Sequence, residues 1–111
     1  MNKILLITLL IPFPASAAET EYTLIIKDQQ FKPNQITILT GEKIKLEIDN
    51  QDNEPVEFES VEISREVLVA GHGKTSIFVG PLDPGSYRFL NDFNHHMEGT
   101  IVVRPKPVKS Y

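Results

Sequence analysis

The most informative absence in this 111-residue sequence is cysteine, of which there is none. A domain this small has a limited core, and exported domains of its size often add disulfides. Its stability must therefore come from packing, with help from any bound metal. Without a thiolate the chain has no blue-copper centre and no cysteine nucleophile, and a lipid anchor, which needs a cysteine, is excluded as well.

A long apolar segment and an excess of basic residues are also missing. The apolar run at residues 4–11 is too short to cross a bilayer, and it lies between Lys3 and the small residues 15–18. That order is typical of a secretory signal peptide, so we expect residues 1–18 to be removed on export. Because only Lys3 is lost, the mature chain has ten basic and fifteen acidic residues, a formal charge of −5. We therefore expect no nucleic acid or anionic lipid partner and no membrane insertion of the mature protein.

The sequence patterns of common enzyme classes are absent too. The chain has no glycine-rich phosphate loop and no Gly-x-Ser-x-Gly turn, and no nucleophile pattern flanks its three histidines. The sequence therefore leaves enzymatic activity open and favours a binding function.

What the chain does contain is a succession of short β-patterned runs. Residues 43–49 alternate most regularly, which places Ile44, Leu46 and Ile48 on one buried face. Together with residues 35–38 they predict a β-hairpin.

Seven or eight such runs, separated by turn residues and without a convincing helix, define the expected fold. They predict an all-β, antiparallel Greek-key β-sandwich over residues 19–104. Prolines after the last run predict a flexible tail at residues 105–111. The core is expected to contain four phenylalanines, namely Phe31, Phe58, Phe78 and Phe89.

A polar loop at residues 91–99 carries most of the chemistry. It holds two of the three histidines, His95 and His96, and one of the two methionines, Met97. Imidazoles, a thioether and acidic or amide oxygens together offer a metal ion borderline, soft and hard donors. From this stretch alone, a metal site and a solvated turn both remain open.

Two glutamates are the expected partners of this loop. Glu57 and Glu59 lie on the same side of one predicted strand, and the loops at residues 50–55 and 91–99 can lie at the same end of a sandwich. Carboxylate and imidazole ligands suit Cu(II), Fe(II) or Fe(III), and a thioether adds affinity for Cu(I). The predicted metal ligands are Glu57, Glu59, His95, His96 and Met97.

Each of these predicted ligands could also occupy its position without binding a metal. The glutamates suit a solvated sheet face, and Met97 suits core packing. Because neighbouring side chains on a strand point to opposite faces, His95 and His96 cannot both bind one ion unless the backbone bends. Exposed acids are common, so three others are weaker candidates: Asp92, Glu66 and Glu98.

Several motifs carry a resemblance to a known family. They are Asn50, Pro55-Val56-Glu57-Phe58-Glu59-Ser60, Ser64-Arg65-Glu66, the run from Gly80 to Tyr87, and Phe89-Leu90-Asn91-Asp92-Phe93-Asn94. In this order they resemble the cupredoxin-like periplasmic proteins that accompany high-affinity iron permeases and are related to the cupredoxin-like domain of EfeO. The common cupredoxin pattern is only partly met, since Glu57 stands about where the first histidine is expected and the later loop has no cysteine.

The resemblance implies a cupredoxin-like domain that binds copper, iron or both in the periplasm. The implied role is assistance to iron transport, with redox cycling between Fe(II) and Fe(III) left open, and the implied partner is a membrane iron permease or another periplasmic transport component. Two other roles stay open: a non-catalytic periplasmic copper carrier, and a metal-free sandwich that serves as an interaction module.

Overall fold

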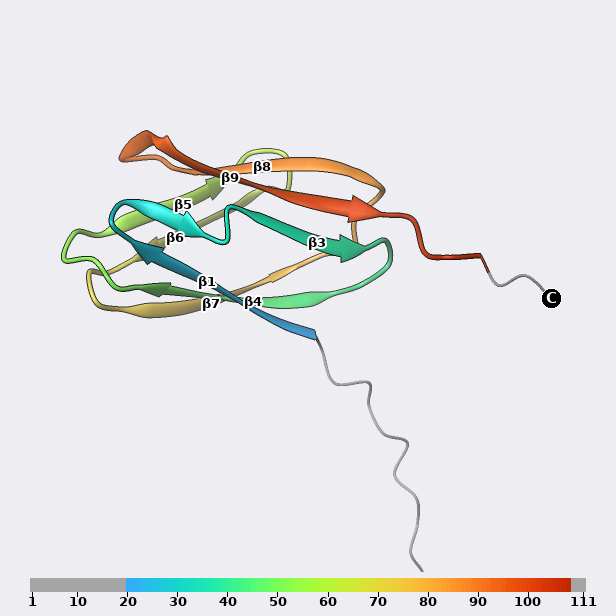
Figure 1. The fold of residues 1–111 in the computed structure, drawn as a ribbon, viewed down its shortest axis with the longest axis horizontal. Helices are drawn as coiled ribbons and strands as arrows, with labels where there is room; N and C mark the ends of the chain where they lie inside the picture. Colours follow the sequence, from blue (N-terminus) through green and yellow to red (C-terminus); the bar gives the residue numbers. More distant parts are fainter. Residues whose placement is uncertain (1–19, 109–111) are drawn as a thin grey trace, which may run out of the picture.

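The computed structural model describes residues 20–108, which form nine β-strands in two layers (Figure 1). The strands are β1 (Thr20–Lys27), β2 (Gln30–Lys32), β3 (Gln35–Leu39), β4 (Ile44–Asn50), β5 (Val56–Ser60), β6 (Arg65–Val69), β7 (Lys74–Val79), β8 (Gly85–Asn91) and β9 (Asn94–Arg104). Within this part of the chain no helix is long and apolar enough to cross a membrane. The expected signal peptide, residues 1–18, lies outside the described residues.

The two sheets have the strand orders β2-β1-β4-β7 and β3-β9-β8-β5-β6. The all-β sandwich is confirmed, but the strand number is nine instead of the predicted seven or eight. The pairing is also not wholly antiparallel, because β1 runs parallel to β4 and β3 runs parallel to β9.

The predicted hairpin of residues 35–38 and 43–49 is wrong. These runs form β3 and β4, which lie in different sheets, and the Glu42 N–H donates to the Leu39 carbonyl in the turn between them. Alternation determines which face of a strand is buried, and both strands do bury one face. It does not determine which strand lies alongside, so the chain can cross between layers at this turn.

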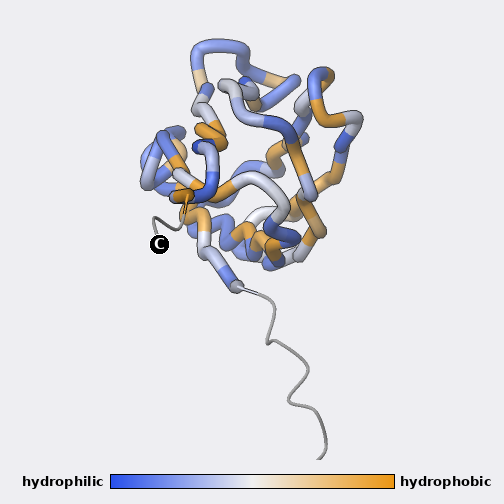
Figure 2. The backbone as a smooth tube through the Cα atoms, turned by 90° about the vertical axis from the view of Figure 1, so that its right-hand side faces the viewer, coloured by the Kyte–Doolittle hydropathy of each residue, from blue (hydrophilic) through white to orange (hydrophobic). Residues whose placement is uncertain are grey.

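The core lies between the sheets and is built from buried residues of both. Hydrophobic and hydrophilic residues alternate along parts of the chain in Figure 2. Ile44, Leu46 and Ile48 are fully buried, as predicted. The rings of Phe58 and Phe89 stack with centroids 5.2 Å apart, and Phe31 meets both edge-on; such aromatic pairs add to the stabilisation from burial.

Phe78 is the exception to the predicted core. It lies on the outer face of β7, is 44% exposed, and has the Lys43 ammonium 5.1 Å from its ring centroid. Its neighbour Val79 takes the inward position, which leaves Phe78 facing outward.

The phenylalanine cluster gives a direct test of the core. We expect Phe58→Ala to lower the free energy of unfolding by about 3–5 kcal/mol, because it removes a fully buried ring and leaves a cavity. Phe93→Ala is the matched control, since Phe93 is 59% exposed, and its effect should stay within about 0.5 kcal/mol. Urea unfolding followed by circular dichroism measures both, and equal losses would contradict this assignment of the core.

Candidate metal site

The candidate site begins on β5, in the five-stranded sheet. Val56, Phe58 and Ser60 point into the core, so Glu57 and Glu59 alternate with them and lie half-buried on the outer face. The neighbouring strand β6 places Glu66 opposite Glu59. Three carboxylates therefore share one patch of sheet surface.

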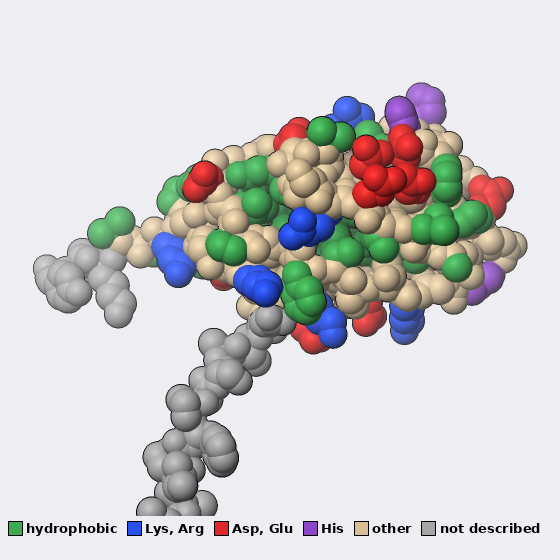
Figure 3. All heavy atoms as spheres, turned by 180° about the vertical axis from the view of Figure 1, so that it is seen from behind, with side chains coloured by type: hydrophobic (Ala, Val, Ile, Leu, Met, Phe, Trp, Pro, Cys, Tyr) green, Lys and Arg blue, Asp and Glu red, His purple; other side chains and the backbone are tan. Residues whose placement is uncertain are grey.

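Asp92 joins this patch from the turn between β8 and β9. Its backbone N–H donates to the Glu57 carbonyl at 2.9 Å, which holds the turn against β5. One carboxylate oxygen from each of Glu57, Glu59 and Asp92 lies within 4.8 Å of the others. Figure 3 shows acidic side chains gathered into one patch on this side of the molecule, with histidine beside it. The sequence ranked Asp92 as a weak candidate, whereas the fold makes it central.

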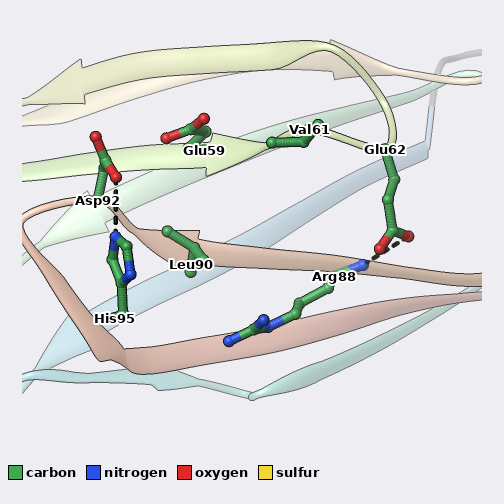
Figure 4. A pocket seen from close by; sticks show the side chains of 7 residues that line it. All are labelled: Glu59, Val61, Glu62, Arg88, Leu90, Asp92 and His95. Carbon is green, nitrogen blue, oxygen red and sulfur yellow. Dashed lines mark hydrogen bonds and ion pairs between the residues drawn. The ribbon is translucent and has the colours of Figure 1, made fainter.

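His95 adds a nitrogen donor to the carboxylates. Its Nε2 lies 2.9 Å from Asp92 Oδ1, and both side chains line the same pocket as Glu59 (Figure 4). The imidazole is 67% exposed. Of the predicted ligands, Glu57 and Glu59 therefore lie in the carboxylate group, and His95 lies beside it through its contact with Asp92.

The two remaining predicted ligands, His96 and Met97, lie elsewhere. Met97 is 4% exposed within the core, and its Sδ accepts a hydrogen bond from Asn91 Nδ2 at 3.4 Å. His96 lines a separate pocket together with Met97 and Glu98. Both histidines lie where the β8–β9 pairing shifts register, since Leu90 is paired with Glu98 while Asn91 is paired with Asn94.

Hydrogen bonding, desolvation and like charges together shape the electrostatics of the patch. Hydrogen bonding with the Glu66 carboxyl, followed by desolvation and the charges of Glu66, Asp92 and Glu59, raises the pKa of Glu57 from 4.5 to about 7. Desolvation and the charges of Asp92 and Glu66 also raise the pKa of Glu59, while His95 opposes this shift. A bound cation relieves such repulsion, which makes the arrangement suitable for a metal ion.

The two packed sheets place the protein among the small β-sandwich proteins. The chain belongs to the cupredoxin-like domain family, whose model matches residues 3–103. It is 38% identical over 84 residues to the uncharacterized protein RP394 of Rickettsia prowazekii (strain Madrid E), a match that covers 75% of this chain and 67% of that protein.

Solved structures with this fold include two copper proteins. The metal binding domain of the Cu(I) exporting P-type ATPase CopA from Streptococcus pneumoniae D39, solved with Cu(I), superimposes with a TM-score of 0.66 at 14% identity, covering 76% of this chain and 84% of that domain. Amicyanin from Paracoccus versutus gives a TM-score of 0.62 at 17% identity, covering 84% and 86%. At these identities the likeness establishes the fold alone.

The raised pKa of Glu57 predicts a pH-dependent stability. Because the folded protein holds this proton more tightly than the unfolded chain, the stability it confers is complete below pH 4.5 and is lost as pH rises through about 7. We expect Glu57→Gln to remove this decline in the metal-free protein. Thermal unfolding of the metal-free protein from pH 4 to 8 measures this loss of stability. The control is Glu47→Gln, on β4 of the four-stranded sheet. An identical pH profile for wild type and Glu57→Gln would contradict the raised pKa of Glu57.

Proposed function

We propose that this protein is a periplasmic cupredoxin-like protein that binds copper or iron and assists iron transport. Glu57, Glu59, Asp92 and His95 would hold the ion. The observation that carries this proposal is the convergence of three carboxylates from β5 and the β8–β9 turn, with an imidazole directly on one of them.

The donor set decides which metals the site can accept. A blue-copper centre does not fit, because the chain has no cysteine. Carboxylate and imidazole ligands suit Cu(II), Fe(II) and Fe(III), and a bound ion of this kind would supply positive charge and the capacity for one-electron change. Met97 offers the soft sulfur that Cu(I) prefers, but it is held in the core by Asn91. The site therefore favours the harder, oxidised ions.

Export and the transport role rest on sequence features. The apolar start supports delivery to the periplasm, and the resemblance to iron-permease accessory proteins supports a membrane iron permease or another periplasmic transport component as partner. An acidic patch that captures a cation from solution is consistent with either delivery or storage.

Removing the carboxylates tests the site. We expect the triple variant Glu57→Gln, Glu59→Gln, Asp92→Asn to lower the affinity for Cu(II) by more than about 100-fold, since three charged ligands become neutral. A matched control neutralises two glutamates and one aspartate outside the patch: Glu21→Gln, Glu47→Gln, Asp83→Asn. Calorimetric titration of the mature protein with Cu(II) and anaerobic Fe(II) gives both affinities. No saturable binding near one ion per chain in the wild type would refute the proposal.

The two adjacent histidines provide an internal control. His95→Ala should weaken Cu(II) binding by about 10-fold to 100-fold and remove the nitrogen hyperfine coupling from the paramagnetic resonance spectrum. His96→Ala should leave both unchanged, because His96 lines a different pocket. Weakened Cu(II) binding in His96→Ala together with unchanged binding in His95→Ala would place the metal in the pocket that His96 lines.

The role of the bound metal can be separated from its binding. Fe(II) oxidation under oxygen is measured with the metal-free and the copper-loaded protein. An increased rate with copper assigns a redox role in iron uptake, whereas an unchanged rate assigns a non-catalytic carrier.

A further inference from the structure

The edge strand β6 leaves part of its backbone without a partner. It pairs only with β5, so its other side is a free edge of the five-stranded sheet. The Glu57 N–H donates to Asn91 Oδ1 at 3.1 Å, and the Glu57 carbonyl accepts from the Asp92 N–H at 2.9 Å. Both groups therefore point away from β6. Opposite residues of an antiparallel pair share this orientation, so Leu68, opposite Glu57, turns its N–H and C=O toward the free edge.

Glu66 repeats this arrangement two positions earlier on β6. The backbone direction alternates along a strand, so the N–H and C=O of Glu66 also point toward the free edge. Within residues 20–108 no other group donates to or accepts from these four backbone groups. Two residues in this orientation offer the hydrogen bonds that one further antiparallel strand needs.

The other sheet edges are better protected than β6. On β3, the Thr37 carbonyl accepts a hydrogen bond from Tyr22 Oη at 3.4 Å. On β7, the Phe78 carbonyl accepts one from Arg65 Nε at 2.9 Å. The remaining edge strand, β2, is only three residues long. Short strands and covering side chains are common ways to prevent an edge from pairing with another chain.

The side chains beside the free edge are one apolar and one acidic group. Leu68 is 61% exposed, and Glu66 is exposed on the same outer face, two residues away. Figure 3 shows exposed hydrophobic side chains beside the acidic patch on this side of the molecule. No lysine or proline, the residues that commonly prevent edge pairing, lies within β6. An added strand would place one side chain against Leu68 and another against Glu66.

A second copy of the chain does not suit this edge. If β6 paired with itself about a two-fold axis through Val67, Glu66 of each copy would lie opposite Leu68 of the other. The acidic patches of both copies would then adjoin on one face of the combined sheet. Like charges so placed destabilise the pairing, whereas a basic side chain beside Glu66 stabilises it. The edge therefore favours a partner of opposite charge.

We propose that the β6 edge binds an extended segment of a partner protein as an added antiparallel strand. The segment has an apolar residue opposite Leu68 and, two residues later, a lysine or arginine opposite Glu66. In this mode of recognition the backbone hydrogen bonds give affinity and alternate side chains give selectivity. The inference goes beyond the proposed function, because the added strand needs no bound metal.

A peptide titration tests this proposal. The capped peptide Thr-Thr-Val-Thr-Lys-Thr-Thr is added to the metal-free, nitrogen-15-labelled mature protein and followed by nuclear magnetic resonance. We expect saturable binding with a Kd of about 1 mM or tighter, with the largest shifts at the amides of Glu66 and Leu68. Methylating the valine and lysine backbone nitrogens should abolish binding, because it removes the donors to β6. Replacing lysine by glutamate should weaken binding by about tenfold or more.

Two variants locate the added strand on β6. Leu68→Lys should weaken binding of the lysine peptide by about tenfold or more, because it replaces the apolar contact with a charge like that of the peptide. Its matched control is Ser76→Lys, an exposed position on the protected edge β7, which should bind like wild type. Glu66→Gln should reduce the preference for lysine over glutamate in the peptide, whereas Glu47→Gln on β4 should keep it.

Several results would overturn the proposal. They are no binding of the lysine peptide, equal binding of its methylated form, largest shifts on β3 or β7, and unchanged affinity in Leu68→Lys. Concentration-dependent dimerisation without peptide, abolished by Leu68→Lys, would assign the edge to a second copy instead. All of these measurements use the metal-free protein, so their outcome is independent of the Cu(II) and Fe(II) titrations that test the proposed function.

Discussion

The site depends on one buried amide, the side chain of Asn91. Its Oδ1 accepts hydrogen bonds from the backbone N–H groups of Glu57 and Phe93, and its Nδ2 donates to Met97 Sδ. These contacts tie the β8–β9 turn to β5 and to the core at a position that is only 4% exposed. A buried amide without partners costs about 1–3 kcal/mol, so the contacts hold the turn in one arrangement. In that arrangement Asp92 lies beside Glu57 and His95 beside Asp92.

The carboxylate patch conflicts with the stability of the metal-free fold. Like charges on adjacent strands destabilise a sheet. The pKa of Glu57 is raised by its hydrogen bond with Glu66 and by desolvation, and the neighbouring carboxylates add to this shift. The rest of the sheet follows the usual rules of alternation and burial, with a fully buried aromatic pair directly beneath. A local conflict within an otherwise consistent fold is typical of a functional site.

The comparison with copper proteins of the same fold separates scaffold from chemistry. This chain shares the sandwich with the CopA domain and with amicyanin but has no cysteine, and its buried methionine and asparagine bond to each other. The charged donors lie on the outer face of the five-stranded sheet. One scaffold can carry sites of different chemistry because a site depends on a few side chains and the fold on many.

The sequence by itself determined the fold class and the faces of the strands. Period-two alternation assigned Ile44, Leu46 and Ile48 to the core and put Glu57 and Glu59 on one outer face, because that period follows from strand geometry. Only the tertiary structure decided which strands are neighbours, why Phe78 faces outward, and which of two adjacent histidines meets the carboxylates. Those outcomes depend on pairing between distant residues and on a register shift at Leu90 and Asn91, and local alternation contains no information about either. Asp92 joins the site because its backbone N–H bonds to the carbonyl of Glu57, a residue distant in the sequence.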